Sequence, residues 1–178
     1  PIVITALGSP KAVVEGIQSY GGLVWADVNS LTYAQKAASV GVDGLVLVAA
    51  GAGGHTGPIS GFALAPAVRE VFDGTIILGG GIGTGRAIRA ARMLGADLAN
   101  LGTRLIACEE SMAVPDYKQM LIEATAEDIV LSAALTGVPA NWLKKSLAAA
   151  GYDAEGLKTK AEINLGRPED TAKRWRDV

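Results

Sequence analysis

The only histidine of the chain, His55, lies in the segment GAGGHTG, where four of the seven residues are glycine. A neutral imidazole titrates close to neutral pH, so it can accept a proton or stabilise a developing negative charge. The glycines leave little side-chain volume near the ring, which would let a flat ligand lie against the backbone with the imidazole at its edge. The alternative is that the glycines only form a turn and that His55 is structural.

Two later glycine-rich segments could bind an anion. The segment GGGIGTG spans residues 79–85, and GTR spans residues 102–104. Backbone amides that glycines expose, together with a helix N-terminus, can stabilise a phosphate without a lysine. The predicted donors are the amides of Gly80, Gly81, Gly102 and Thr103, with the Thr103 hydroxyl in addition. Each run could also be only a tight turn between a strand and a helix, and GGGIGTG lacks the rest of a dinucleotide-binding fingerprint.

Other chemistries have less support in the sequence. His55 has no second histidine beside it, and Cys108 is the only cysteine, so we expect no metal site. Neither Ser9 nor Ser60 lies in a nucleophile elbow. A net charge of −2 and a pI near 5.4 argue against a nucleic-acid partner, and no apolar run is long enough to span a membrane. The low cysteine content fits a cytoplasmic protein.

Short apolar runs alternate with helical patterns along the first part of the chain. The predicted strands are Ile2–Leu7, Leu23–Asp27, Gly44–Val48, Thr75–Leu78 and Leu98–Leu101. The predicted helices are Pro10–Ser19, Leu31–Val40, Phe62–Phe72 and Gly85–Leu94. Three helices end at a glycine directly before the next strand (Gly21, Gly41 and Gly95), where glycine supplies the left-handed conformation that terminates a helix.

This repeat predicts an α/β fold with parallel strands, either a barrel or a doubly wound sheet. Ligands of such folds bind at the carboxyl ends of the strands. Three consecutive predicted strands are followed by the glycine-rich segments that begin near residues 49, 79 and 102. We therefore expect His55 and the predicted anion-binding amides to lie on one rim.

The composition changes after Cys108. From Met112 to Trp175 the sequence predicts no strand, only helices such as Tyr117–Thr125 and Asn141–Ala150, with a loop at Thr136–Trp142. We therefore expect two domains, residues 1–107 as the βα array and residues 108–178 as a helical appendage.

Three segments together resemble the nitronate monooxygenases, also called 2-nitropropane dioxygenases: DGLVLVAAGAGGHTGP, TIILGGGIGTGRAIRAARMLGADLANLGTR and LTGVPANWL. The resemblance runs through most of the chain. It implies an FMN-dependent (β/α)8 TIM barrel, of which this chain matches strands 4–8, with a helical second domain. It also implies that His55 is the catalytic histidine, that Gly79, Gly80, Gly81, Gly102 and Thr103 hold the FMN phosphate, and that Gly53 and Gly54 let the flavin ring approach.

The family activity implied is oxidation of an alkyl nitronate or nitroalkane by dioxygen, giving a carbonyl compound and nitrite, in a protein that can be a homodimer. Trp142 would form an apolar wall on the substrate side, or only pack the appendage. Some relatives carry a lysine where this chain has Trp25, Ala26 and Asp27. Two alternatives remain: an FMN-dependent enoyl-carrier-protein reductase, which shares the barrel and a similar GGH loop, and a half-barrel without catalytic activity.

Overall fold

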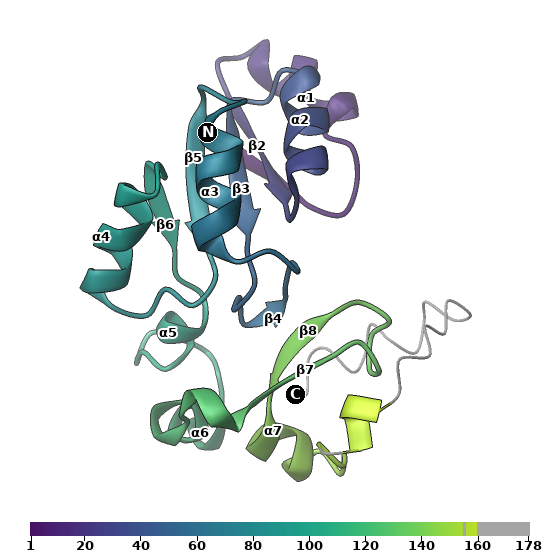
Figure 1. The fold of residues 1–178 in the computed structure, drawn as a ribbon, viewed down its shortest axis with the longest axis vertical. Helices are drawn as coiled ribbons and strands as arrows, with labels where there is room; N and C mark the ends of the chain where they lie inside the picture. The colour runs from purple at the N-terminus through teal and green to yellow at the C-terminus, as the bar shows by residue number, and fades with distance from the viewer. Residues whose placement is uncertain (155, 160–178) are drawn as a thin grey trace. The chain divides into compact units, whose positions relative to one another are not determined.

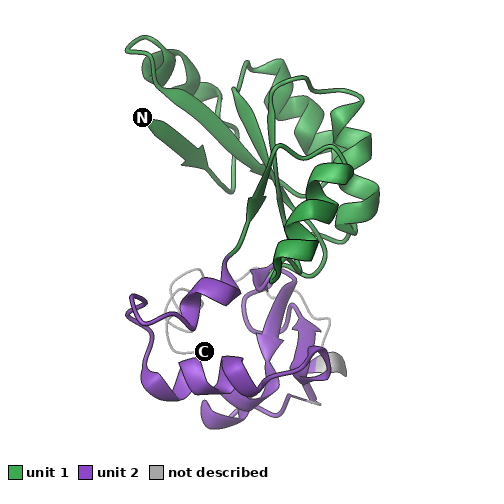
Figure 2. Ribbon diagram, turned by 90° about the vertical axis from the view of Figure 1, so that its left-hand side faces the viewer, with its two compact units in different colours: residues 1–52, 57–101 green, residues 53–56, 102–178 purple. Residues whose placement is uncertain are grey.

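The computed structural model describes residues 1–154 and 156–159, which divide into two compact units (Figure 2). The first unit comprises residues 1–52 and 57–101, and the second comprises residues 53–56 and 102 onwards. The segment GAGGHTG therefore belongs to both units, because residues 53–56 form part of the second. Within the described residues, no helix combines the length and the apolar character needed to cross a bilayer.

The first unit is a five-stranded parallel sheet in which a helix connects each strand to the next (Figure 1). Its strands, in spatial order, are β1 (Ile2–Thr5), β2 (Leu23–Val28), β3 (Gly44–Val48), β5 (Thr75–Gly79) and β6 (Leu98–Asn100). Its helices are α1 (Lys11–Gln18), α2 (Leu31–Ser39), α3 (Gly61–Arg69) and α4 (Gly85–Met93). The spatial order of the strands follows the chain order. The expected strands and helices of this unit are confirmed, with bounds that agree to within about three residues at each end.

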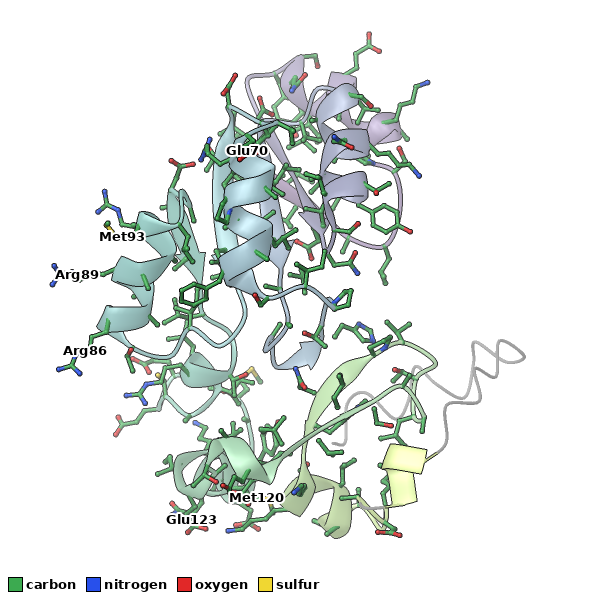
Figure 3. All side chains as sticks on the ribbon, viewed as in Figure 1. Glu70, Arg86, Arg89, Met93, Met120 and Glu123 are labelled. Carbon is green, nitrogen blue, oxygen red and sulfur yellow. The ribbon has the colours of Figure 1, made fainter. Side chains whose placement is uncertain are left out.

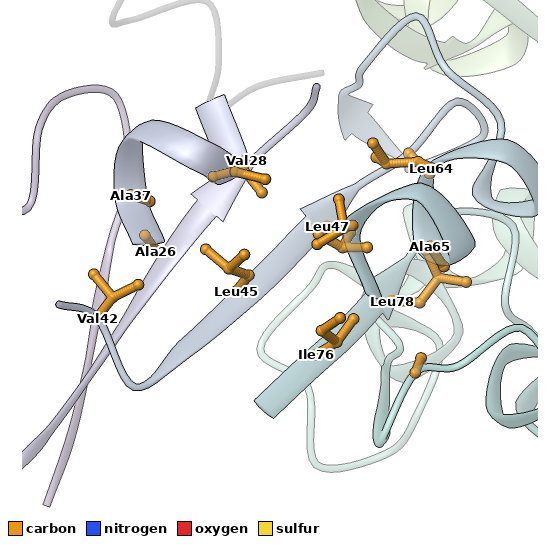
Figure 4. Packing of buried hydrophobic residues seen from close by; sticks show 14 of the residues in the cluster. Ala26, Val28, Ala37, Val42, Leu45, Leu47, Leu64, Ala65, Ile76 and Leu78 are labelled. Atoms are coloured by element: carbon orange, nitrogen blue, oxygen red, sulfur yellow. The ribbon is translucent and has the colours of Figure 1, made fainter. Parts of the chain in front are cut away.

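All four helices pack on one face of this sheet. Strand residues that alternate onto that face, such as Leu45, Leu47 and Ile76, are fully buried in one cluster with the α3 residues Leu64 and Ala65 (Figure 4). A doubly wound sheet would carry helices on both faces. Sequential strand order with helices on one face is instead the arrangement of successive units of a (β/α)8 barrel.

The helix ends follow local sequence signals. The hydroxyls of Ser30 and Thr84 cap α2 and α4 by accepting hydrogen bonds from backbone amides of their first turns. Gly21, Gly41 and Gly95 have positive φ and precede β2, β3 and β6, as expected. The outward face of α4 carries exposed residues that include Arg86, Arg89 and Met93, and their side chains point away from the sheet (Figure 3).

The second unit is built around a three-stranded antiparallel sheet with the order β4-β8-β7. Its elements are β4 (Gly54–His55), α5 (Thr103–Ile106), α6 (Pro115–Glu123), η1 (Ala126–Asp128), β7 (Ile129–Ser132), β8 (Ala140–Leu143), α7 (Lys144–Ala149) and η2 (Gly156–Thr159). Buried residues of β7, β8 and α7 form a separate apolar cluster that includes Val130, Trp142 and Leu147.

The expectation of no strand after Met112 is wrong within the described residues, since β7 and β8 lie there. The loop expected at Thr136–Trp142 ends in β8, and the helix expected from Asn141 begins only at Lys144. The physical reason is non-local: β8 pairs with β7 on one side and with β4 on the other, and such partners leave no periodic signal in a segment of four residues. The helix expected at Tyr117–Thr125 is confirmed as α6.

Candidate functional site

The loop after β5 exposes backbone at Gly80 and Gly81. Both residues have positive φ, +128° and +68°, which favours glycine. A Cβ at Gly80 would lie 2.9 Å from the carbonyl oxygen of Ala49, whereas a Cβ at Gly81 would meet nothing within 4 Å. Gly80 is therefore required for close packing of two loops, and the backbone of Gly81 faces open space.

One of the predicted anion donors, the Gly81 amide, already makes a hydrogen bond within the protein. The Gly81 amide already donates to the carbonyl oxygen of Gly51 at 2.9 Å, so an anion at this point would have to share that donor. This bond also ties the GGGIGTG loop to the start of the GAGGHTG segment. The next glycines of the loop, Gly83 and Gly85, likewise have open space where a Cβ would be. The loop is therefore open at Gly81, Gly83 and Gly85, while Ile82 packs on the core and Thr84 caps α4.

Gly79 is the last residue of β5 and pairs in register with Val48 of β3 and Asn100 of β6. A Cβ at Gly79 would lie 3.5 Å from the side-chain nitrogen of Asn100. The side-chain amide of Asn100 has no hydrogen-bond partner among the described residues. Asn100 is a residue of this rim that was not predicted from the sequence. The available signal was a polar residue at the carboxyl end of an otherwise apolar strand.

His55 lies in the second unit, in the two-residue strand β4. Gly54 pairs with Asn141 and His55 with Ala140, and the Thr56 amide donates to the carbonyl oxygen of Pro139 at 3.1 Å. This pairing holds the backbone on both sides of the imidazole. The side chain is half-buried, and its desolvation lowers the pKa of the imidazole. His55 is therefore neutral at pH 7, the form that can accept a proton.

Gly53 and Thr103 contact each other within the second unit. A Cβ at Gly53 would collide with the Thr103 hydroxyl, so glycine at this position admits the threonine side chain. Gly102 is the N-cap residue of α5, and a Cβ there would meet nothing within 4 Å. The structure thus joins the GAGGHTG segment to the GTR segment through Gly53 and Thr103.

Trp142 is buried, with 6% of its surface exposed, and its indole nitrogen donates to the carbonyl oxygen of Ser132 at 3.2 Å. Of the two interpretations of this residue, the structure supports packing of the second unit. Asn141, its neighbour in β8, is half-buried and shares a face of the antiparallel sheet with Gly54. Asn141 was not predictable from the sequence, because its place beside Gly54 depends on the β4–β8 pairing.

The comparisons with known proteins address the family directly. The family model described as nitronate monooxygenase matches residues 1–167. The chain belongs to the nitronate monooxygenase family. Rv1533 of Mycobacterium tuberculosis, which carries a monooxygenase name, is 37% identical over 80% of this chain and 39% of its own length. A Rhodococcus jostii protein named as a 5-hydroxy-7a-methyl-1-oxo-octahydro-1H-indene-4-carboxyl-CoA dehydrogenase is 28% identical over 80% of this chain and 40% of its own length.

Solved structures support the same relationship. The M276A mutant of FabK from Thermotoga maritima superposes with a TM-score of 0.78 at 31% identity, over 84% of this chain and 50% of that protein. A nitroalkane oxidase from Streptomyces ansochromogenes gives a TM-score of 0.75 at 30% identity, over 80% and 45%. The chain therefore spans about half or less of the length of its relatives, and its sheet corresponds to part of their TIM barrels.

Proposed function

We propose that the protein is an FMN-dependent oxidoreductase that oxidises alkyl nitronates with dioxygen to a carbonyl compound and nitrite. The observation that carries this proposal is the open, positive-φ backbone at Gly81, at the carboxyl end of a barrel-type sheet in a nitronate monooxygenase family member. A glycine-rich loop in that position suits a phosphate dianion, which would share the Gly81 amide with the carbonyl oxygen of Gly51. Because the chain covers under half of its curated relatives, the proposal concerns the protein of which these residues form the catalytic part.

The residues present fit a flavin phosphate at the loops after β5 and β6. Gly79, Gly80 and Gly81 would hold it from the first loop, and Gly102 and Thr103 from the second, where the backbone at Gly102 is also open. Bound FMN would supply electron transfer between the nitronate and dioxygen. Ring approach at the GAGGHTG segment is proposed for Gly54, because the corresponding space at Gly53 is occupied by Thr103.

His55 would act on the substrate as a hydrogen-bonding group and proton acceptor. Its lowered pKa keeps the imidazole neutral at pH 7, so it can take a proton from a neutral nitroalkane or bind the nitro group of a nitronate. We expect proton abstraction to fail as the pH falls through the pKa of His55, below its ordinary value of about 6.5. Oxidation of a preformed nitronate should be less sensitive to this titration, because no proton has to be removed.

The test is a visible spectrum of the protein purified with excess FMN, followed by assay of nitrite release from a nitronate. A flavin spectrum with stoichiometric nitrite and carbonyl product is expected. A protein that stays colourless and takes up no FMN would instead support the half-barrel without catalytic activity.

A second candidate is oxidation or reduction of an acyl thioester. The name of the Rhodococcus jostii relative, a carboxyl-CoA dehydrogenase, favours this candidate. The enoyl-carrier-protein reductase suggested by the GGH loop would also act on an acyl thioester. The two candidates differ in their electron donor. Rapid reduction of the flavin without oxygen, by NADH or NADPH for the reductase or by an acyl-CoA for the dehydrogenase, with no nitrite from nitronates, would select the thioester reaction. Residues 108–178 are proposed to form the substrate-side domain in either case.

A further inference from the structure

The connection between α5 and α6 is built around one lysine. Both helices belong to the second unit, and residues 107–114 connect them (Figure 1). The ammonium of Lys118, in α6, donates to the carbonyl oxygens of Cys108 at 2.7 Å, Ser111 at 2.8 Å and Glu109 at 3.3 Å. An ammonium carries three N–H donors, so the turn at residues 108–111 takes up all of them.

The positive charge of Lys118 is balanced by these carbonyl groups alone. Within the described part of the chain the half-buried Lys118 makes no ion pair, although Glu109, Glu110 and Asp116 lie nearby in the sequence. Carbonyl oxygens that surround one point repel one another unless a cation lies between them. Such groups of backbone carbonyl oxygens bind potassium ions in channels. Lys118 therefore serves this turn as a cation that is tethered to α6.

Successive hydrogen bonds connect this turn to Gly102. The Leu105 amide donates to the carbonyl oxygen of Gly102 at 2.9 Å, and the Cys108 amide donates to that of Leu105 at 3.3 Å. The Ser111 amide donates to the carbonyl oxygen of Cys108 at 3.2 Å, and the same oxygen accepts from Lys118. The ammonium thus holds the backbone at the C-terminal end of α5, while Gly102 is the N-cap residue of that helix.

We propose that Lys118 is a positioning residue for FMN: it holds the turn at residues 108–111 and, through α5, the backbone of Gly102 and Thr103 that binds the phosphate. This inference rests on the proposed function. With four residues, α5 is too short to be stable by itself, so the start of the helix depends on what holds its end. A water molecule in place of the ammonium has only two donors and no charge, and cannot hold all three carbonyl groups.

The experiment measures the FMN dissociation constant of Lys118→Ala by quenching of flavin fluorescence. Loss of the ammonium should raise this constant about tenfold. Propylammonium replaces the atoms that the substitution removes, and its addition should restore the wild-type affinity. Tetramethylammonium at the same ionic strength has the charge but no N–H donor, and should not restore it.

A second measurement does not need the flavin. Hydrogen exchange of the Cys108 and Ser111 amides should be faster in Lys118→Ala than in the wild type, and propylammonium should slow it again. Lys145→Ala is the matched control. Lys145 also lies in the second unit, but its side chain is 52% exposed and pairs with Glu123 at 3.0 Å. This variant should keep the wild-type FMN affinity and the wild-type exchange at both amides.

The outcomes separate the two proposals. Wild-type FMN affinity in Lys118→Ala overturns the positioning role and leaves the proposed function standing. Faster exchange that propylammonium does not slow also overturns it, because the ammonium would then not be the group that holds the turn. A wild-type protein that binds no FMN overturns both proposals. If Lys118→Ala fails to fold, Lys118→Met keeps most of the apolar stem and is measured in the same way, with ammonium in place of propylammonium.

Discussion

The two ends of the parallel sheet use aspartate and glycine for different purposes. At the amino end, Asp43 and Asp97 precede β3 and β6, and their carboxylates accept the amides of Val24 and Ile76 at 2.8 Å. Their own amides donate to the carbonyl oxygens of the same two residues, also at 2.8 Å. Arg69 adds an ion pair to Asp97 at 2.6 Å and donates to three backbone carbonyl oxygens. Every group named here has its partner within the fold.

At the carboxyl end, by contrast, the polar groups are left open. The side chains of Asp27 and Asn100 have no partner among the described residues, and a Cβ at Gly81 would meet open space, although the Gly81 amide donates to the carbonyl oxygen of Gly51 at 2.9 Å. At the amino end, aspartate side chains close the sheet, whereas at the carboxyl end only backbone groups bond to one another, and ligands of such sheets bind at this end. Substitutions at the two ends should therefore affect different measurements.

The largest effect is expected from His55→Ala. Loss of a positioned proton acceptor should lower kcat about 100-fold or more, with FMN content and melting temperature close to those of the wild type. Steady-state kinetics with a neutral nitroalkane and flavin absorbance measure the two quantities. His55→Gln keeps a hydrogen-bonding group but cannot titrate, so recovery of activity in that variant would argue against proton transfer.

Gly81→Asp and Gly41→Asp form a matched pair across the two ends. Both glycines have positive φ, +68° and +84°, and open space where a Cβ would be, so the backbone strain should be similar. Only Gly81→Asp puts a carboxylate beside the proposed phosphate, and we expect its FMN affinity to fall about 100-fold. Quenching of flavin fluorescence on binding gives the dissociation constants. Equal FMN affinity in the two variants would remove the proposed phosphate site.

Asp97→Asn should affect stability and leave flavin binding unchanged. The loss of charge weakens the hydrogen bond from Ile76 and the pairing with Arg69, which should lower the free energy of unfolding by about 1–2 kcal/mol, since the pair is partly exposed. The hydrogen bond from the Ile76 amide lowers the pKa of Asp97, so its stabilisation is complete above the unfolded-state pKa of about 3.9. Urea unfolding should show the difference from wild type shrinking as the pH falls through the lower, folded-state pKa. A constant difference at acid pH would contradict this.

Asp27→Asn should change the free energy of unfolding in the opposite direction, and this is the smallest of the expected effects. Because desolvation raises the pKa of Asp27, ionisation in the folded state is disfavoured, and the variant should be more stable at pH 7, by no more than about a few tenths of a kcal/mol because water screens the exposed carboxylate. This gain should disappear below about pH 4, where both folded and unfolded wild type are protonated. The same urea titration measures it. A variant less stable than wild type at pH 7 would indicate a partner for the carboxylate within the protein.

The strands of the first unit were predictable because each is a continuous apolar run, and most follow a glycine that ends a helix. The strands β4, β7 and β8 were not, because Gly54 and Asn141 become strand residues only by pairing with each other across a long stretch of chain. The positions of the glycine-rich loops were predictable because each loop directly follows a predicted strand. That Asp43 is satisfied and Asp27 is not could not be read from the sequence, because both lie near strand ends and differ only in whether a neighbouring amide points at them.

A crystal structure of the protein with FMN would test directly whether the flavin binds at the carboxyl end of the parallel sheet. We predict that the phosphate binds at the loop of Gly79–Gly81 and that the flavin ring lies at the carboxyl end of the parallel sheet. A flavin bound at the amino end near Asp43 and Asp97, or on the face that the helices cover, would contradict it.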